Sequence, residues 1–168
     1  MRRILTTIAL TVLLVACGGS GPTTNDGSPA PTSKSDTALN AGAQADFNTR
    51  AGALCKTASR ELAAAPRGQD PVHNTPEMTR RAQTGTEIFG RLADGLRALP
   101  PPPGEEGRVQ SLIVSVTVTQ QQMRNLLVAA ESGDQERMQA ELAELNRVMT
   151  ETDQALTGFG IAGCNGEA

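Results

Sequence analysis

Hydrophobic residues recur at helical spacing in the second half of the chain, most regularly between positions 138 and 159. Successive positions of this pattern are separated by four, three, four, three, four and three residues. Residues at this spacing lie on one face of an α-helix. The pattern therefore predicts an amphipathic helix that buries a continuous stripe, formed by Met138, Leu142, Leu145, Met149, Thr152, Leu156 and Phe159.

Three earlier stretches, 45–65, 75–99 and 105–132, show the same steps of three and four. Their stripes are Phe47, Ala51, Leu54, Ala58, Leu62 and Ala65 in the first, Met78, Ala82, Gly85, Ile88, Phe89, Leu92, Leu96 and Leu99 in the second, and Val109, Leu112, Val116, Thr119, Met123, Leu126 and Ala130 in the third. Residues 112–119 also alternate Val with Thr or Ser, which is typical of a β-strand. We interpret the third stretch as a helix, because the helical steps run through it and a lone strand would lack a partner.

Start and stop signals separate these stretches. Thr-Pro-Glu at 75–77 combines a hydroxyl cap, a proline at the first helical position and a carboxylate near the positive end of the helix dipole. Four prolines at 100–103 end the second helix, Gly133 ends the third, and Asp134 caps the fourth. Four amphipathic helices with short connections predict an all-α fold, an antiparallel up-down four-helix bundle.

The N-terminus has the composition of a secretory signal. Arg2 and Arg3 precede an apolar run from Ile4 to Ala16, and these 13 residues are fewer than the ~20 needed to span a bilayer. Leu-Val-Ala-Cys at 14–17 resembles the bacterial lipobox, whose cysteine is acylated before cleavage. The resemblance implies that Cys17 becomes the N-terminus and carries diacylglycerol and an amide-linked acyl chain such as palmitate. The alternative is an ordinary secretory signal with an incidental thiol at Cys17.

Nearly all residues from Gly18 to Thr37 are Gly, Ser, Thr, Pro, Asn or Asp. This composition cannot bury enough apolar surface to offset the entropy of ordering, so it predicts disorder. We therefore divide the chain into a lipoprotein signal peptide at 1–16, a lipidated cysteine and disordered linker at 17–40, and a four-helix domain at 41–168. Because two or three acyl chains anchor stably, we expect the mature chain on the extracytoplasmic face of the cell membrane.

The chain has three cysteines. Assigning Cys17 to lipid leaves Cys55 and Cys164, an even pair in an oxidising compartment. We expect a disulfide that joins the first helix to the C-terminal tail. In an up-down bundle the tail starts at the pole where the first helix begins, and it is long enough to fold back the ~15 Å along that helix to Cys55. The competing interpretation is a redox or metal-binding thiol, although neither cysteine belongs to a Cys-x-x-Cys motif.

Composition and the absence of known motifs argue against nucleic-acid binding, metal binding and most kinds of catalysis. The net charge is −3, and becomes −5 without Arg2 and Arg3, so no nucleic-acid partner is expected. The one histidine, His73, lies in a polar loop bounded by prolines, and the motifs of serine hydrolases, P-loop proteins and zinc proteases are absent. We expect no catalytic residue, no metal site and no cofactor, and interpret the chain as not an enzyme.

Polar residues on the predicted helices have plain structural interpretations. Gln120–Gln122 could line a pocket, but we expect these amides to face water. Arginines on the second helix are interpreted as complementing acidic residues on the fourth, which form a solvated face. The arginines are Arg80, Arg81, Arg91 and Arg97, and the acids are Asp134, Glu136, Glu141, Glu144, Glu151 and Asp153.

Taken together, the lipobox, the Ser/Thr/Pro-rich linker and an Ala- and Arg-rich helical domain resemble small α-helical lipoproteins of high-GC Gram-positive bacteria. The excess of Arg over Lys fits such a genome. The resemblance implies a lipid anchor and a helical domain, and it implies no activity.

Two function classes remain open. The first, which is the function that we predict, is a non-enzymatic interaction module that docks an envelope protein or cell-wall component through a helix face. The second is a carrier that holds a small apolar ligand or lipid between the helices of an alanine-rich core. An internal cavity above ~300 Å³ would favour the carrier. A closed bundle with an exposed apolar groove would favour the module.

Overall fold

The computed structural model describes residues 34–65, 75–161 and 164. All of them belong to one compact unit, Ser33–Ala168, which contains its own core and the disulfide. The predicted signal peptide at 1–16, the lipidation site Cys17, the linker as far as residue 33, and His73 lie outside the described residues.

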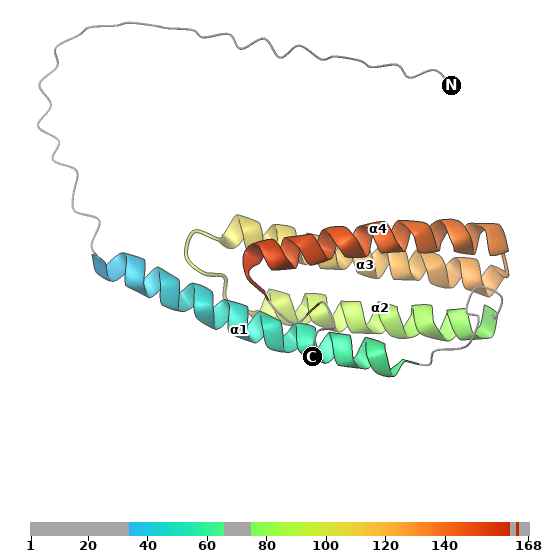
Figure 1. Ribbon diagram of the computed structural model, residues 1–168, viewed down its shortest axis with the longest axis horizontal. Helices are drawn as coiled ribbons and strands as arrows, with labels where there is room; N and C mark the ends of the chain where they lie inside the picture. Colours follow the sequence, from blue (N-terminus) through green and yellow to red (C-terminus); the bar gives the residue numbers. More distant parts are fainter. Residues whose placement is uncertain (1–33, 66–74, 162–163, 165–168) are drawn as a thin grey trace, which may run out of the picture. The chain divides into compact units, whose positions relative to one another are not determined.

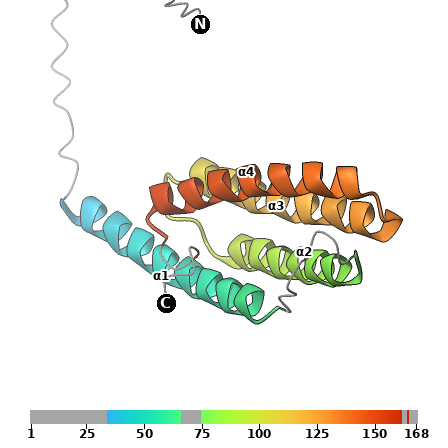
Figure 2. The same ribbon diagram turned by 45° about the vertical axis from the view of Figure 1, so that its right-hand side comes forward.

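Four helices account for most of the described chain: α1 (Lys34–Ala64), α2 (Thr75–Ala98), α3 (Glu106–Ser132) and α4 (Gln135–Phe159). Successive helices run in opposite directions, and α1 and α2 lie beside the pair formed by α3 and α4 (Figures 1 and 2). The packing of α2 on α3 and of α3 on α4 is more extensive than that of α1 on α2. The predicted antiparallel four-helix bundle is confirmed. No described helix is long and apolar enough to cross a bilayer.

The predicted stripes form most of the core. Every stripe position of α3 is buried, as are all those of α2 except the half-buried Leu99. In α1, Cys55 is buried within the stripe, whereas Leu54 and Leu62 are half-buried against the core. In α4, Val148 is buried, but the predicted stripe residue Met149 is 38% exposed. The stripe of α4 is therefore wrong at one position.

Helix α3 settles the ambiguity of residues 112–119, which are helical throughout. Hydroxyl groups help to fit β-branched and small polar residues into this helix, because they donate to the carbonyl four residues earlier. Thr117 Oγ1 donates to the Ile113 carbonyl at 2.8 Å, and Ser115 Oγ donates to the Ser111 carbonyl at 3.2 Å. Two of the alternating valines, Val114 and Val118, lie on the exposed side of the helix.

Helix α1 begins at Lys34, earlier than the predicted start at Ala45. It occupies the last seven residues of the range 17–40 that was predicted to be disordered linker, so that boundary was placed too late. Leu39, within this extension, is 71% exposed. Local propensity rather than packing accounts for the added turns, because Ala41, Ala43 and Ala45 are strong helix formers.

The predicted caps of α3 and α4 are confirmed. Gly133 ends α3 with φ 68°, and Asp134 accepts a hydrogen bond from the Arg137 backbone N–H at 3.0 Å. Gly160 ends α4 with φ 85°, and the next residue, Ile161, donates its backbone N–H to the Leu156 carbonyl at 3.0 Å. This arrangement is a Schellman motif. The motif ends α4, and Cys164, four residues after Gly160, is bonded to Cys55 of α1.

Candidate functional site

A pocket of about 350 Å³ opens where α1 faces α4. Its lining is mainly apolar, and α2 and α3 form part of its wall. Helix α1 approaches α4 near the C-terminal tail and diverges from it toward its own C-terminal end (Figures 1 and 2). The lining residues are Cys55, Ala58, Ser59, Leu62, Phe89, Leu92, Thr119, Met149, Thr150, Thr152, Asp153, Leu156 and Cys164.

The pocket explains the exposure of Met149. In a closely packed bundle this side chain would contact α1, but α1 presents Ala58 and Ser59 along this wall. Small side chains cannot fill the space between diverging helices, so Met149 borders the pocket instead of packing in the core. Most of the lining therefore comes from the predicted apolar faces of the four helices.

One end of the pocket wall is held by contacts that α1 makes with the end of α4 and with Cys164. The Phe47 and Phe159 rings have centroids 5.3 Å apart, and Asn48 Nδ2 donates to the Phe159 carbonyl at 3.3 Å. Further along α1, Cys55 is disulfide-bonded to Cys164, with the two Cα atoms 4.6 Å apart. The predicted disulfide is confirmed, and both of its cysteines line the pocket.

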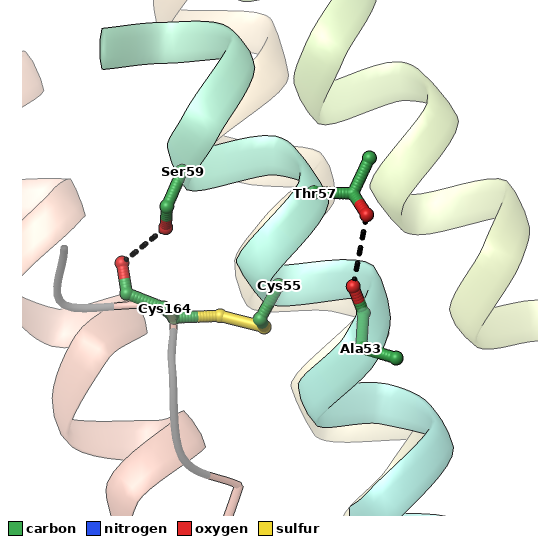
Figure 3. The surroundings of a disulfide bond; sticks show 5 residues. All are labelled: Ala53, Cys55, Thr57, Ser59 and Cys164. Carbon is green, nitrogen blue, oxygen red and sulfur yellow. Dashed lines mark hydrogen bonds between the residues drawn. A yellow bond between two sulfur atoms is a disulfide. The ribbon is translucent and has the colours of Figure 1, made fainter. Parts of the chain in front are cut away.

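The disulfide is reinforced by a second link from the next turn of α1. Figure 3 shows Cys55 and Ser59 both directed toward Cys164. Ser59 Oγ donates to the Cys164 carbonyl at 2.9 Å. Cys55 is fully buried, whereas Cys164 is half-buried. These contacts fix one edge of the pocket to the tail.

Two threonine hydroxyls lie at the base of the pocket. Thr119 Oγ1 and Thr152 Oγ1 are 2.9 Å apart, and both residues are buried. Each hydroxyl is also 3.2 Å from the Ser115 carbonyl oxygen, which can accept from either. A third hydroxyl, Thr150 Oγ1, donates to the Asn146 carbonyl at 2.9 Å. These three hydroxyl groups of the wall are therefore hydrogen-bonded within the protein.

Asp153 is the one ionisable side chain among the described lining residues. It is half-buried, and within the described chain it makes neither a hydrogen bond nor an ion pair. Met149 and Leu156 lie four residues before it and three residues after it, so all three share one face of α4. The interpretation of Asp153 as part of a solvated acidic face is therefore corrected: this residue is half-buried and lines the pocket.

Other acidic residues of α4 do form ion pairs, but with their own helix. Arg147 pairs with Glu144 and Glu151, all of them on the exposed side. The hydrogen bond from Arg147 lowers the pKa of the Glu144 carboxyl, and the two carboxylates raise the pKa of Arg147. The arginines of α2 do not complement α4 as expected, since Arg91 pairs with Glu61 of α1 and Arg97 with Asp94 of α2.

The glutamine cluster of α3 also differs from the expectation that it faces water. Gln122 is buried, and its Nε2 donates to the Glu141 carboxylate at 2.6 Å and to the Glu141 carbonyl at 3.2 Å. Gln120 is half-buried and donates to the Thr86 carbonyl at 3.3 Å. Only Gln121 is exposed. Gln120 and Gln122 thus join α3 to α2 and α4, and none of the three glutamines lines the pocket.

Within the described residues, no group of three or more His, Cys, Asp or Glu side chains is arranged to hold a metal ion. The sequence analysis raised a ligand site between the helices as one alternative, but it did not place this pocket or include Asp153 in its wall. Two features of the sequence were signals of this site: the small residues in the α1 stripe, and a carboxylate on α4 at helical spacing from Met149 and Leu156. A comparison with protein-family models finds no match to this chain, and comparisons with curated proteins and with solved structures also find none.

Proposed function

We propose that this chain is a binding protein that holds a small, largely apolar ligand in the pocket between α1 and α4. The observation that carries the proposal is the pocket volume of about 350 Å³, which reaches the lower range of small-molecule sites. The apolar wall supports it, because desolvation of hydrocarbon favours binding by about 25 cal/mol for each Å² buried. A binding role also suits a lining in which Asp153 is the one ionisable described side chain.

The pocket can be tested by native mass spectrometry of the Ser33–Ala168 polypeptide, secreted with its disulfide formed. We expect a discrete added mass that disappears on denaturation. Ala58→Leu places a larger side chain in the pocket wall and should remove most of the added mass. Ala63→Leu is the matched control, because Ala63 is exposed on the last turn of the same helix. Equal ligand occupancy in both variants would contradict the proposed site.

The second part of the proposal is the location: we infer a lipid anchor at Cys17 that holds the domain at the extracytoplasmic face of the cell membrane. The lipobox resemblance and the polar segment after it support this location. Cys17→Ala should abolish both membrane retention and incorporation of a labelled fatty acid. Cys164→Ala, which removes a different cysteine, should leave both unchanged. A membrane fraction that survives the Cys17 substitution would refute the anchor.

An interaction module is the other candidate function, and one observation favours it. Val114, Val118 and Val128 are each about half exposed on the solvent side of α3, away from the pocket. Their spacing of four and ten residues keeps them near one face of the helix. Crosslinking in intact cells tests this candidate: a partner captured through α3 and lost in Val118→Lys would support the module.

A further inference from the structure

We propose that the ligand of the pocket is a small amphipathic cation, with an ammonium group beside Asp153 and its hydrocarbon against the apolar wall. This inference rests on the proposed binding function and specifies the class of ligand. It follows from the polarity of the pocket wall, which offers hydrogen-bond acceptors and no unused hydroxyl donor among the described side chains.

Each of the four hydroxyl groups in the wall already donates its proton to the protein. Ser59 donates to the Cys164 carbonyl, and Thr150 donates to the Asn146 carbonyl. The Thr119 and Thr152 hydroxyls are satisfied by the Ser115 carbonyl and by each other. A hydroxyl has one proton, so none of these four groups has a donor left for a ligand.

The carboxylate of Asp153 adds two further acceptor oxygens. Its half-buried position reduces its contact with water, and no described side chain neutralises it. A charge in such a position favours a partner of opposite sign. A fatty acid or a phosphate ester would instead bring an anion beside a carboxylate, with no described cationic side chain in the lining. The ligand's polar end must therefore be a donor, and a cationic donor fits best.

The wall near Asp153 suits an alkyl chain. Met149 and Leu156 lie on the same face of α4 as Asp153, and Leu92 and Phe89 of α2 contribute to the same lining. A primary alkylamine can thus place its ammonium group at the carboxylate while its chain contacts these four side chains. The negative net charge of the chain, −3, also favours approach of a cation.

The test compares three probes of equal chain length, octylammonium, 1-octanol and octanoate, binding to oxidised Ser33–Ala168 at neutral pH. Affinities are measured by following backbone amide NMR shifts at the pocket. We expect octylammonium to bind at least about fivefold more tightly than 1-octanol, because a single half-exposed ion pair contributes an affinity gain of that size. We expect octanoate to bind most weakly of the three. Asp153→Asn should reduce octylammonium to the affinity of 1-octanol and leave 1-octanol unchanged.

Glu136→Gln is the matched control, because it removes one exposed carboxylate from the same helix outside the pocket. It should leave all three affinities unchanged. A measurement without substitution covers the case in which Asp153→Asn fails to fold. In the unsubstituted protein, the preference for octylammonium over 1-octanol should shrink as salt concentration rises, since the half-exposed pair is screened.

The outcomes separate this inference from the proposed function. Equal binding of the three probes, or tighter binding of octanoate, would overturn the cationic ligand but leave the pocket as a binding site. A co-purified ligand without a basic group would do the same. If no probe shifts the pocket amides and no mass co-purifies, both proposals fail.

Discussion

The Cys55–Cys164 disulfide should supply a large part of the stability of the domain. The two cysteines are separated by 109 residues in sequence. In the chain-entropy model, a loop of this length lowers the entropy of the unfolded chain by about 16 cal/mol/K, or about 4.8 kcal/mol at 25 °C. Removal of a native disulfide from a small secreted domain typically costs 2–5 kcal/mol, so we expect a loss of about 3 kcal/mol or more. That is a large share of a typical stability of 5–15 kcal/mol.

Its loss should loosen α1 before the other helices. Helix α1 packs less extensively than α2, α3 or α4, and its links to the end of α4 are the Phe47–Phe159 contact, the Asn48 hydrogen bond and the bonds to Cys164. Reduction removes the covalent link and frees the tail that accepts the Ser59 hydrogen bond. Amide hydrogen exchange should therefore accelerate in α1 more than in the interior of α3.

The assay is urea denaturation of Ser33–Ala168, followed by far-ultraviolet circular dichroism with and without a phosphine reductant. The Cys55→Ala/Cys164→Ala double variant controls for the reductant, because its unfolding should not respond to it. A difference below about 1 kcal/mol between the oxidised and reduced domains would refute the chain-entropy argument. Equal acceleration of exchange in α1 and α3 would refute the view that the disulfide chiefly holds α1.

Three further changes test local features of the fold. Gly160→Ala should destabilise the domain by about 1 kcal/mol, because φ is 85° there and the added Cβ would lie 3.0 Å from Asn48 Nδ2. Gly158→Ala, in open helical surroundings, should be neutral or stabilising. The midpoints of urea denaturation distinguish the two variants. Asp134→Ala should cost about 1 kcal/mol by the same assay through loss of the α4 cap, and Asp134→Asn should retain most of it. The Glu144 carboxyl should titrate by NMR with a pKa below its usual value, and Arg147→Gln should raise that pKa. Because the folded-state pKa is lowered, the pair stabilises the fold at neutral pH, and this contribution is lost as the pH falls through that pKa. An unchanged titration of Glu144 in Arg147→Gln would contradict the assigned cause.

The helices were predictable because their signals lie within short stretches of sequence. The disulfide was predictable because the number of cysteines limits the possible pairings. Apolar steps of three and four identify the buried face of each helix, and Gly133 and Asp134 mark the turn between α3 and α4 by their own conformational preferences. The pairing of Cys55 with Cys164 followed from topology once a third cysteine was assigned elsewhere. The early start of α1 was not predictable from an apolar stripe, since Leu39 in the added turns is exposed.

The pocket was not predictable because periodicity identifies which face of a helix is apolar but not how far away its partner lies. Met149 and Val148 illustrate the limit: both are hydrophobic neighbours on α4, yet the first is 38% exposed and the second 3%. The choice between them depends on the tilt of α1. Ala58 and Ser59 on α1 lack the volume to fill the space that this tilt opens, and the disulfide holds the tail at its edge. The same tilt places Asp153 beside an apolar wall rather than in a solvated acidic row, which is why its charge bears on the choice of ligand.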